Sequence, residues 1–222
     1  FAFIDVFDKN TFLENSEVVK EIVKLLEDKQ LKYNGKQQFL GDFFEKLLNI
    51  GIKQEEGQFF TPTPITEFIV KSLPIENIIK NKLTSREPNF MPYTIDYACG
   101  SGHFLTEVMM YADNILKKID GNFLNSKQLE NYNSWVNGYR WAGEFIYGIE
   151  KDYRLSKTTK IACFLNGDGI ANIICADGLA DFKNKKYKGK LNIKNGKNNN
   201  QFDLVIANPP YAVDGFVNAC KE

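Results

Sequence analysis

Short apolar segments alternate with helical patterns along most of this chain, and that alternation limits its fold more than any other feature. The apolar segments centre on Ile95, Ile149, Ile174 and Val205. Strands that alternate with helices usually pair in parallel through right-handed crossovers. A ligand of such a sheet binds outside the carboxyl ends of the strands. The pattern therefore predicts an α/β fold with a mostly parallel sheet, and a site among the residues that follow each strand.

A glycine-rich loop follows the first predicted strand, which ends at Asp96, and precedes a predicted helix that continues to Leu116. Small side chains let a ligand approach the loop backbone, and N–H groups at the helix start would face that ligand. The third glycine of the dinucleotide fingerprint is missing, so the loop alone is weak evidence for a nucleotide site. Its small residues are Ala98, Gly100, Ser101 and Gly102.

The last apolar segment ends in Asn208-Pro209-Pro210-Tyr211, which is suited to holding a planar amine. Two prolines fix φ and remove two backbone donors, so the loop presents carbonyls without competing N–H groups. Together with the amide oxygen of Asn208, these carbonyls can accept both protons of an exocyclic NH2, and Tyr211 offers a face for stacking. A strand followed by an ordinary Asn-Pro turn explains the tetrapeptide about as well.

Three segments in chain order resemble the motifs of N6-adenine DNA methyltransferases of restriction-modification systems, in particular type I modification subunits and the related fused type IIG enzymes. Gly57-Gln-Phe-Phe-Thr61-Pro62 is similar to the N-terminal cofactor motif, Asp96 to Gly102 to the glycine-rich motif, and Asn208 to Tyr211 to the catalytic motif. The resemblance covers roughly residues 36 to 212. It implies a Rossmann-like S-adenosylmethionine-dependent methyltransferase fold, with an N-terminal helical region at 1–56 and a catalytic domain at 57–222.

The resemblance also implies a cofactor site for S-adenosylmethionine. Glu150, at the end of the second strand, is expected to take both ribose hydroxyls, Asp177 the adenine amine, and Thr61 the cofactor's carboxylate. Tyr97 stands where the family often has proline. Lys151 stands where the family often has an apolar residue that packs on the adenine ring, and Leu179 or Phe182 could supply this apolar contact instead. The implied cofactor residues are Phe60, Thr61, Pro62, Asp96, Ala98, Cys99, Gly100, Ser101, Gly102, Phe104, Glu150, Lys151, Asp177, Gly178 and Asn208.

The function implied by the resemblance is site-specific methylation of adenine N6 in DNA. The target adenine would be flipped, stacked on Tyr211, and held by Asn208 and the carbonyl of Pro209, with Pro210 stiffening the loop. Since no nucleophilic cysteine is required, Cys99 is expected to pack in the cofactor loop, and His103 to open the helix rather than act as a base. The alternatives are methylation of ribosomal RNA or of a protein glutamine, or a non-catalytic cofactor-binding subunit of a restriction complex. The Gly-Gln-Phe-Phe-Thr-Pro motif favours DNA.

Composition agrees with a cytoplasmic enzyme. The 222 residues are 43% hydrophobic, enough for a core, and carry no net charge, so any DNA-binding surface must be local or lie elsewhere. No apolar run approaches the roughly 18 residues of a membrane span. The four cysteines lack Cys-x-x-Cys spacing and the chain has one histidine, so no metal site is expected and the thiols are expected to be buried in a reducing compartment.

The ends of the chain suggest a fragment, expected to have an unpaired sheet edge and no target-recognition region. Alone it is not expected to methylate DNA specifically, and we expect specificity and restriction subunits or fused domains as partners.

Ser16 is predicted to cap a helix whose apolar residues face the core, a second helix is expected at 39–48, and a third at Thr63 with Pro64 in the first helical position. The lysine-rich segment 183–197 is expected to be a solvated loop, or else to touch phosphate. The apolar residues of the first helix are Val18, Val19, Ile22, Val23, Leu25 and Leu26.

Overall fold

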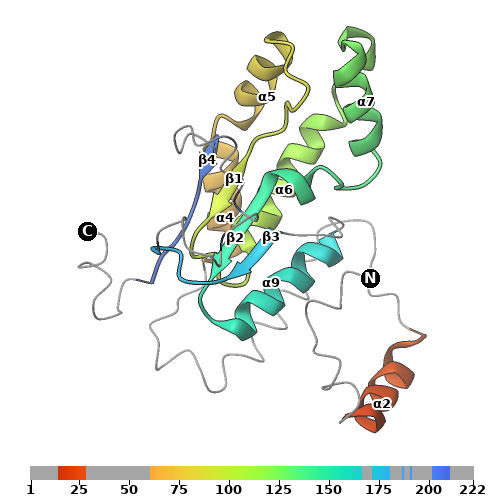
Figure 1. The fold of residues 1–222 in the computed structure, drawn as a ribbon, viewed down its shortest axis with the longest axis vertical. Coiled ribbons are helices and arrows are strands. Elements are labelled where there is room, and N and C mark those ends of the chain that lie inside the picture. The colour runs from red at the N-terminus through yellow and green to blue at the C-terminus, as the bar shows by residue number, and fades with distance from the viewer. Residues whose placement is uncertain are drawn as a thin grey trace.

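A four-stranded parallel sheet forms the centre of the molecule (Figure 1). The computed structural model describes residues 15–28, 61–166, 172–180, 187, 191 and 202–210. The sheet has the order β3-β2-β1-β4. This arrangement of a parallel sheet with helices confirms the predicted α/β, Rossmann-like fold. The strands are β1 (Thr94–Asp96), β2 (Ile146–Glu150), β3 (Asn172–Cys175) and β4 (Leu204–Val205).

The strand order reverses direction between β1 and β4. The chain runs outward from β1 to β2 and β3, and then returns to the other side of β1 as β4. Thr94 is accordingly paired with Ile146 on one side and with Leu204 on the other. Such a reversal is a topological switch point, where the loops after two adjacent strands diverge and leave room for a ligand. The two loops at this point are the glycine-rich loop and the segment that contains Asn208.

Both faces of the sheet are covered, which is usual for parallel strands. Successive residues of β2 alternate between two apolar clusters: Ile146 belongs to the larger one, while Tyr147 and Ile149 belong to the smaller one. Leu105 and Cys163 also belong to the larger cluster, and they place two helices on that face. The helices are α2 (Ser16–Leu26), α4 (Thr63–Ser72), α5 (Ile75–Thr84), α6 (His103–Leu116), α7 (Ser126–Trp135), α8 (Ala142–Phe145) and α9 (Tyr153–Asn166), with a 3-10 turn at Gly121–Phe123.

Several local predictions about the helices are wrong. In α2 the N-cap is Asn15 rather than Ser16, and the apolar face is not in the core, because Val18, Ile22, Val23 and Leu25 are 48% to 71% exposed. An amphipathic pattern shows which side chains share a face, but the neighbour that covers the face comes from elsewhere in the chain. In α4 the first helical residue is Thr63, so Pro64 is second. The helix predicted at 39–48 lies outside the described residues.

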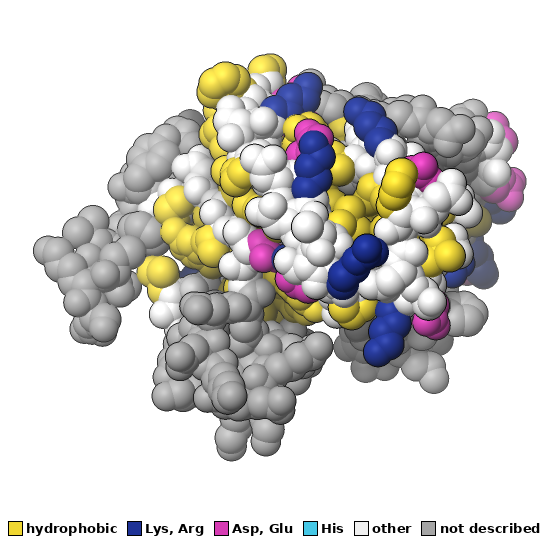
Figure 2. Space-filling view, turned by 90° about the horizontal axis from the view of Figure 1, so that it is seen from above, with side chains coloured by type: hydrophobic (Ala, Val, Ile, Leu, Met, Phe, Trp, Pro, Cys, Tyr) yellow, Lys and Arg dark blue, Asp and Glu magenta, His cyan; other side chains and the backbone are white. Residues whose placement is uncertain are grey.

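Charged side chains on one face of the described molecule are mixed in sign. Figure 2 shows lysine and arginine interspersed with aspartate and glutamate on this face, without a continuous basic patch. No helix among the described residues is long and apolar enough to cross a membrane. Within the described part of the chain, β4 pairs only with β1, and Val205 is 64% exposed.

Candidate active site

The loop between β1 and α6 is a tight turn that requires glycine at two positions. Gly100 and Gly102 have φ of 51° and 84°, a region that side chains rarely adopt. Gly102 also lies against α9, where an added Cβ would come within 2.6 Å of Cγ2 of Thr159. The buried Thr159 hydroxyl donates to the carbonyl of Gly100. The predicted strand, glycine loop and helix are thus confirmed, and α6 begins at His103 as expected.

Glu150, at the end of β2, holds this loop from the neighbouring strand. Its Oε2 accepts from the N–H of Gly100 over 2.8 Å, and its Oε1 accepts from the N–H of Asp152 over 2.8 Å. Burial raises the pKa of this carboxyl, and the two hydrogen bonds oppose that rise. A carboxylate offers four lone pairs, so this one retains capacity for a further donor.

Asp96 ends β1 beneath the same loop. Its side chain is 1% exposed and its Oδ1 accepts from the N–H of Ala98 over 3.0 Å. Burial raises the pKa of Asp96 to about 7, and the nearby charge of Glu150 adds to the rise. Two carboxyl groups from adjacent strand ends therefore lie close together under the glycine loop.

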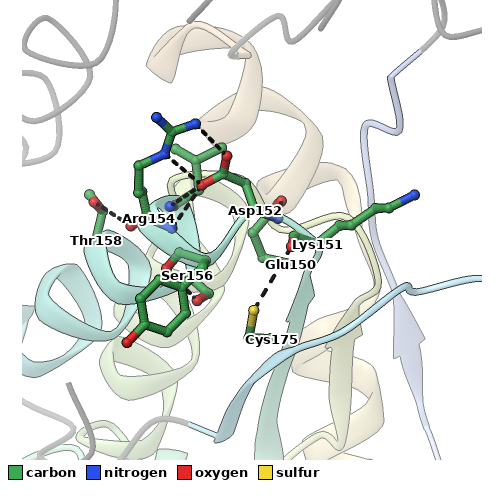
Figure 3. A network of polar contacts seen from close by, with 9 residues as sticks. Glu150, Lys151, Asp152, Arg154, Ser156, Thr158 and Cys175 are labelled. Atoms are coloured by element: carbon green, nitrogen blue, oxygen red, sulfur yellow. Dashed lines mark hydrogen bonds and ion pairs between the residues drawn. The ribbon is translucent and has the colours of Figure 1, made fainter. Parts of the chain in front are cut away.

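The loops after β2 and β3 form the next part of the site, and Figure 3 shows the first of them beside the end of β3. Asp152 caps α9, since its Oδ1 accepts from the N–H groups of Arg154 and Leu155. Lys151 Nζ lies 3.4 Å from Oδ2 of Asp177, while its carbonyl accepts from the thiol of Cys175 over 3.8 Å. Cys175 is exposed, so the prediction that this thiol is buried is wrong, whereas Cys99 and Cys163 are buried as expected.

Gly178 connects the loop after β3 with the loop after β1. A Cβ at this position would overlap the carbonyl oxygen of Tyr97, so only glycine permits the approach. The neighbouring Asp177 carbonyl accepts from the Tyr187 hydroxyl. Asp96, Gly100, Glu150 and Asp177 consequently lie at the same carboxyl edge of the sheet, where the sequence places them.

The segment that precedes α4 meets the segment that follows β4. Nδ2 of Asn208 donates to Oγ1 of Thr61 over 3.0 Å, although 147 residues separate them. The ring Nδ1 of His103 lies 3.4 Å from the carbonyl of Thr61. Residues of the first and third motif segments, Thr61 and Asn208, therefore meet, and Thr61 also contacts His103, which directly follows the second segment.

The remaining predicted site residues differ in how deeply they are buried and in whether the structure describes them. Cys99 and Phe104 belong to the apolar core, and burial raises the pKa of Cys99 well above its usual range, so this thiol stays protonated and is a poor nucleophile. Ser101 is also buried, while Pro62 and Pro209 flank Thr61 and Asn208. Phe60 and Tyr211 lie outside the described residues. No group of three or more histidine, cysteine, aspartate or glutamate side chains that could hold a metal ion occurs in the part of the chain that the structure describes.

Two residues of this site were not predicted. Asp152 stands directly before a helix, and an aspartate there is a recognised capping signal that could have identified it. Thr159 has no comparable signal, because its contact with the glycine loop spans 59 residues and a threonine inside a helix is usually unremarkable in sequence. Its role emerges only when α9 is packed on the sheet.

Comparison with known proteins identifies the family of this chain. No curated protein matches the chain. The family model for N-6 DNA Methylase matches residues 35–222, which include all three motif segments. Since the match covers most of the sequence, the chain belongs to the N-6 DNA methylase family.

Proposed function

We propose that this chain transfers a methyl group from S-adenosylmethionine to N6 of a DNA adenine that is flipped out of the duplex, as the modification component of a restriction-modification system. Family membership supports DNA adenine methylation in general. The observation that supports the finer proposal is the Asn208–Thr61 hydrogen bond, because it joins the proposed amine-binding loop to the segment that resembles the first cofactor motif. Residues 1–56 would form a helical region and 57–222 the catalytic domain.

The carboxyl edge of the sheet fits this cofactor. Gly100 is only partly buried and carries no side chain, which suits close approach of a ligand to the loop backbone at this position. In this proposal Glu150 uses its remaining acceptor capacity for the ribose hydroxyls. Asp177 has an exposed carboxylate that can accept the adenine amine, and Lys151 sits beside it. In this proposal Thr61 binds the cofactor's carboxylate.

The catalytic task of the chain is to position an amine. The cofactor supplies a sulfonium-bound methyl group that needs no further activation. Asn208 accepts one hydrogen bond from the adenine amine through Oδ1 and the carbonyl of Pro209 accepts a second, which holds the nitrogen in line for attack. Tyr211 stacks on the flipped base. Proximity and exclusion of water then account for most of the rate.

The test uses a protein that carries this chain together with a target-recognition region. It is incubated with labelled S-adenosylmethionine and unmethylated genomic DNA, and the methylated nucleosides are identified and mapped. We expect N6-methyladenine at a defined motif. Label transferred only in parallel incubations with RNA or with protein would show that the substrate is RNA or a protein glutamine instead, and no transfer despite cofactor binding would indicate a non-catalytic subunit.

Asn208→Ala is the decisive variant. We expect methyl transfer to fall by at least about a hundredfold while cofactor affinity stays nearly unchanged, because the change removes an acceptor used in the reaction. Asn114→Ala, at an exposed asparagine on α6, is the matched control and should keep wild-type turnover. Turnover near wild type in Asn208→Ala would remove Asn208 from the mechanism.

A further inference from the structure

The contact between Asn208 and Thr61 does more than join two motifs, because it uses one particular end of the amide. Nδ2 of Asn208 points at Oγ1 of Thr61 over 3.0 Å. Rotation of the amide by 180° about its last torsion would exchange oxygen and nitrogen at nearly the same positions. With the nitrogen on Thr61, Oδ1 is directed away from Thr61 and is left to accept from another donor.

Thr61 is itself fixed by its surroundings. Its carbonyl lies 3.4 Å from Nδ1 of His103, the first residue of α6, and a carbonyl accepts only if that nitrogen carries a proton. The next residue, Pro62, accepts from the N–H groups of Ile65 and Thr66 over 2.9 and 3.1 Å. Thr66 and Val70 bury one face of α4. The Thr61 hydroxyl therefore stands directly before a helix whose first turn is hydrogen-bonded to Pro62 and whose Thr66 and Val70 are buried.

Asn208, in contrast, has little of its own to fix its amide. It is exposed, and it follows a strand of two residues at the edge of the described sheet. The two prolines after it stiffen the backbone but do not restrain the amide torsion. Orientation of the amide thus depends on a partner from outside the loop.

We infer that Thr61 is a positioning residue: its hydroxyl holds the nitrogen of the Asn208 amide, so that the amide oxygen faces the amine to be methylated. The inference rests on the proposed function, since it concerns the same acceptor. The reversed amide would present NH2 to the substrate NH2, and two donors facing each other cannot bond.

The hydroxyl of Thr61 can serve Asn208 and the cofactor together. A hydroxyl has one proton to donate and lone pairs to accept. If it donates to the carboxylate of the bound cofactor, its remaining role toward Asn208 is that of acceptor, which only the amide nitrogen can satisfy. Cofactor binding would then reinforce the productive orientation of the amide, and the hydrogen bonds would run in one direction from Asn208 through Thr61 to the cofactor.

The experiment is a double-mutant cycle in the same methylation assay, with Thr61→Val, Thr61→Ser, Asn208→Ala and Thr61→Val combined with Asn208→Ala. Thr61→Val should lower kcat by about tenfold or more, while Thr61→Ser, which keeps the hydroxyl, should stay within about threefold of wild type. In the Asn208→Ala background, Thr61→Val should lower kcat by less than about twofold further, because a residue that acts through Asn208 has nothing left to position. If Thr61→Val does not fold, Thr61→Ala takes its place.

A second readout does not depend on turnover. With S-adenosylhomocysteine present, we measure the affinity for duplexes that carry adenine or purine, which lacks the amine, at the mapped target position. The wild type should prefer adenine, and Thr61→Val should lose most of that preference while Thr61→Ser keeps it. Calorimetry with the cofactor alone separates any direct effect on its binding.

Two results would overturn the inference while leaving the proposed function intact. One is a Thr61→Val variant that weakens cofactor binding but keeps both kcat and the preference for adenine. The other is a loss of kcat from Thr61→Val that is equally large in the wild-type and in the Asn208→Ala background. Absence of methylation by the wild type would instead refute the proposed function itself.

Discussion

The N–H of Gly100 donates to the carboxylate of Glu150 over 2.8 Å, so the end of β2 holds the loop that follows β1. The same carboxylate accepts from Asp152 at the start of α9. One side chain that is 8% exposed thereby fixes two backbone segments on neighbouring strands. The acid at this strand end supports the fold of the loop and is also the proposed ribose ligand. Mutation can separate these two roles, because one affects stability and the other affects cofactor affinity.

Replacement of Glu150 should affect both stability and cofactor affinity. Glu150→Ala leaves the N–H groups of Gly100 and Asp152 without their acceptor, which is expected to cost about 1–3 kcal/mol in the free energy of unfolding. Glu150→Gln keeps one acceptor oxygen and should lose less stability. Urea unfolding and calorimetry with S-adenosylmethionine measure the two effects. Full stability in Glu150→Ala would contradict the structural role.

The unfolding free energy should depend on pH through Asp96. Burial raises the pKa of Asp96 from the ordinary 3.8 to about 7, so between these values the folded protein binds more protons than the unfolded chain. This contribution to stability is full below about pH 4 and is lost as the pH rises toward 7. The wild type should therefore lose more stability between pH 5 and pH 8 than Asp96→Asn.

Asp96→Asn is a close control, because its amide oxygen can still accept from Ala98. Glu150, whose pKa is also raised, is present in both proteins and contributes in the same direction to each. Urea unfolding at the two pH values gives the comparison. Parallel pH profiles for the wild type and the variant would show that Asp96 does not titrate in this range.

Features set by neighbouring residues could be predicted from the sequence, whereas features set by distant packing could not. The strand, glycine loop and helix around Gly100 follow from local backbone preferences, and the structure confirms them. Exposure of Cys175 and of the apolar residues of α2 depends on what the rest of the chain covers. The contact of Thr159 with the loop and that of Thr61 with Asn208 exist only once the sheet is assembled.

A methyl group at Gly178 should disturb the site from the β3 side. Gly178→Ala would overlap the Tyr97 carbonyl and push the two loops apart, at a cost of about 1–3 kcal/mol in unfolding free energy. Because Asp177 is adjacent, cofactor affinity should fall as well. Gly121→Ala is the matched control, since the nearest atom to its added Cβ is Cδ1 of Leu129 at 3.5 Å, an ordinary contact. Equal stability of the two variants would argue against close packing at Gly178.

Two lysines of α5 offer a test of how β4 is held. Lys82 pairs with Asp203, which directly precedes β4, and these side chains are 13% and 25% exposed. Oδ2 of Asp203 also accepts from the N–H of Tyr93 over 2.8 Å. Lys80 pairs with Glu76 on the same helix, but both of those side chains are more than half exposed.

Lys82→Met should destabilise the protein by about 1–3 kcal/mol, because it leaves the partly buried Asp203 carboxylate without its cation. Lys80→Met should leave the unfolding free energy unchanged within error, since solvent screens an exposed pair. The N–H groups of Asp203 and Leu204, which donate to the Tyr93 carbonyl, should exchange hydrogen faster in Lys82→Met alone. Because β4 leads directly to Asn208, methyl transfer should fall with it. Identical exchange in the two variants would mean that the ion pair does not secure this strand.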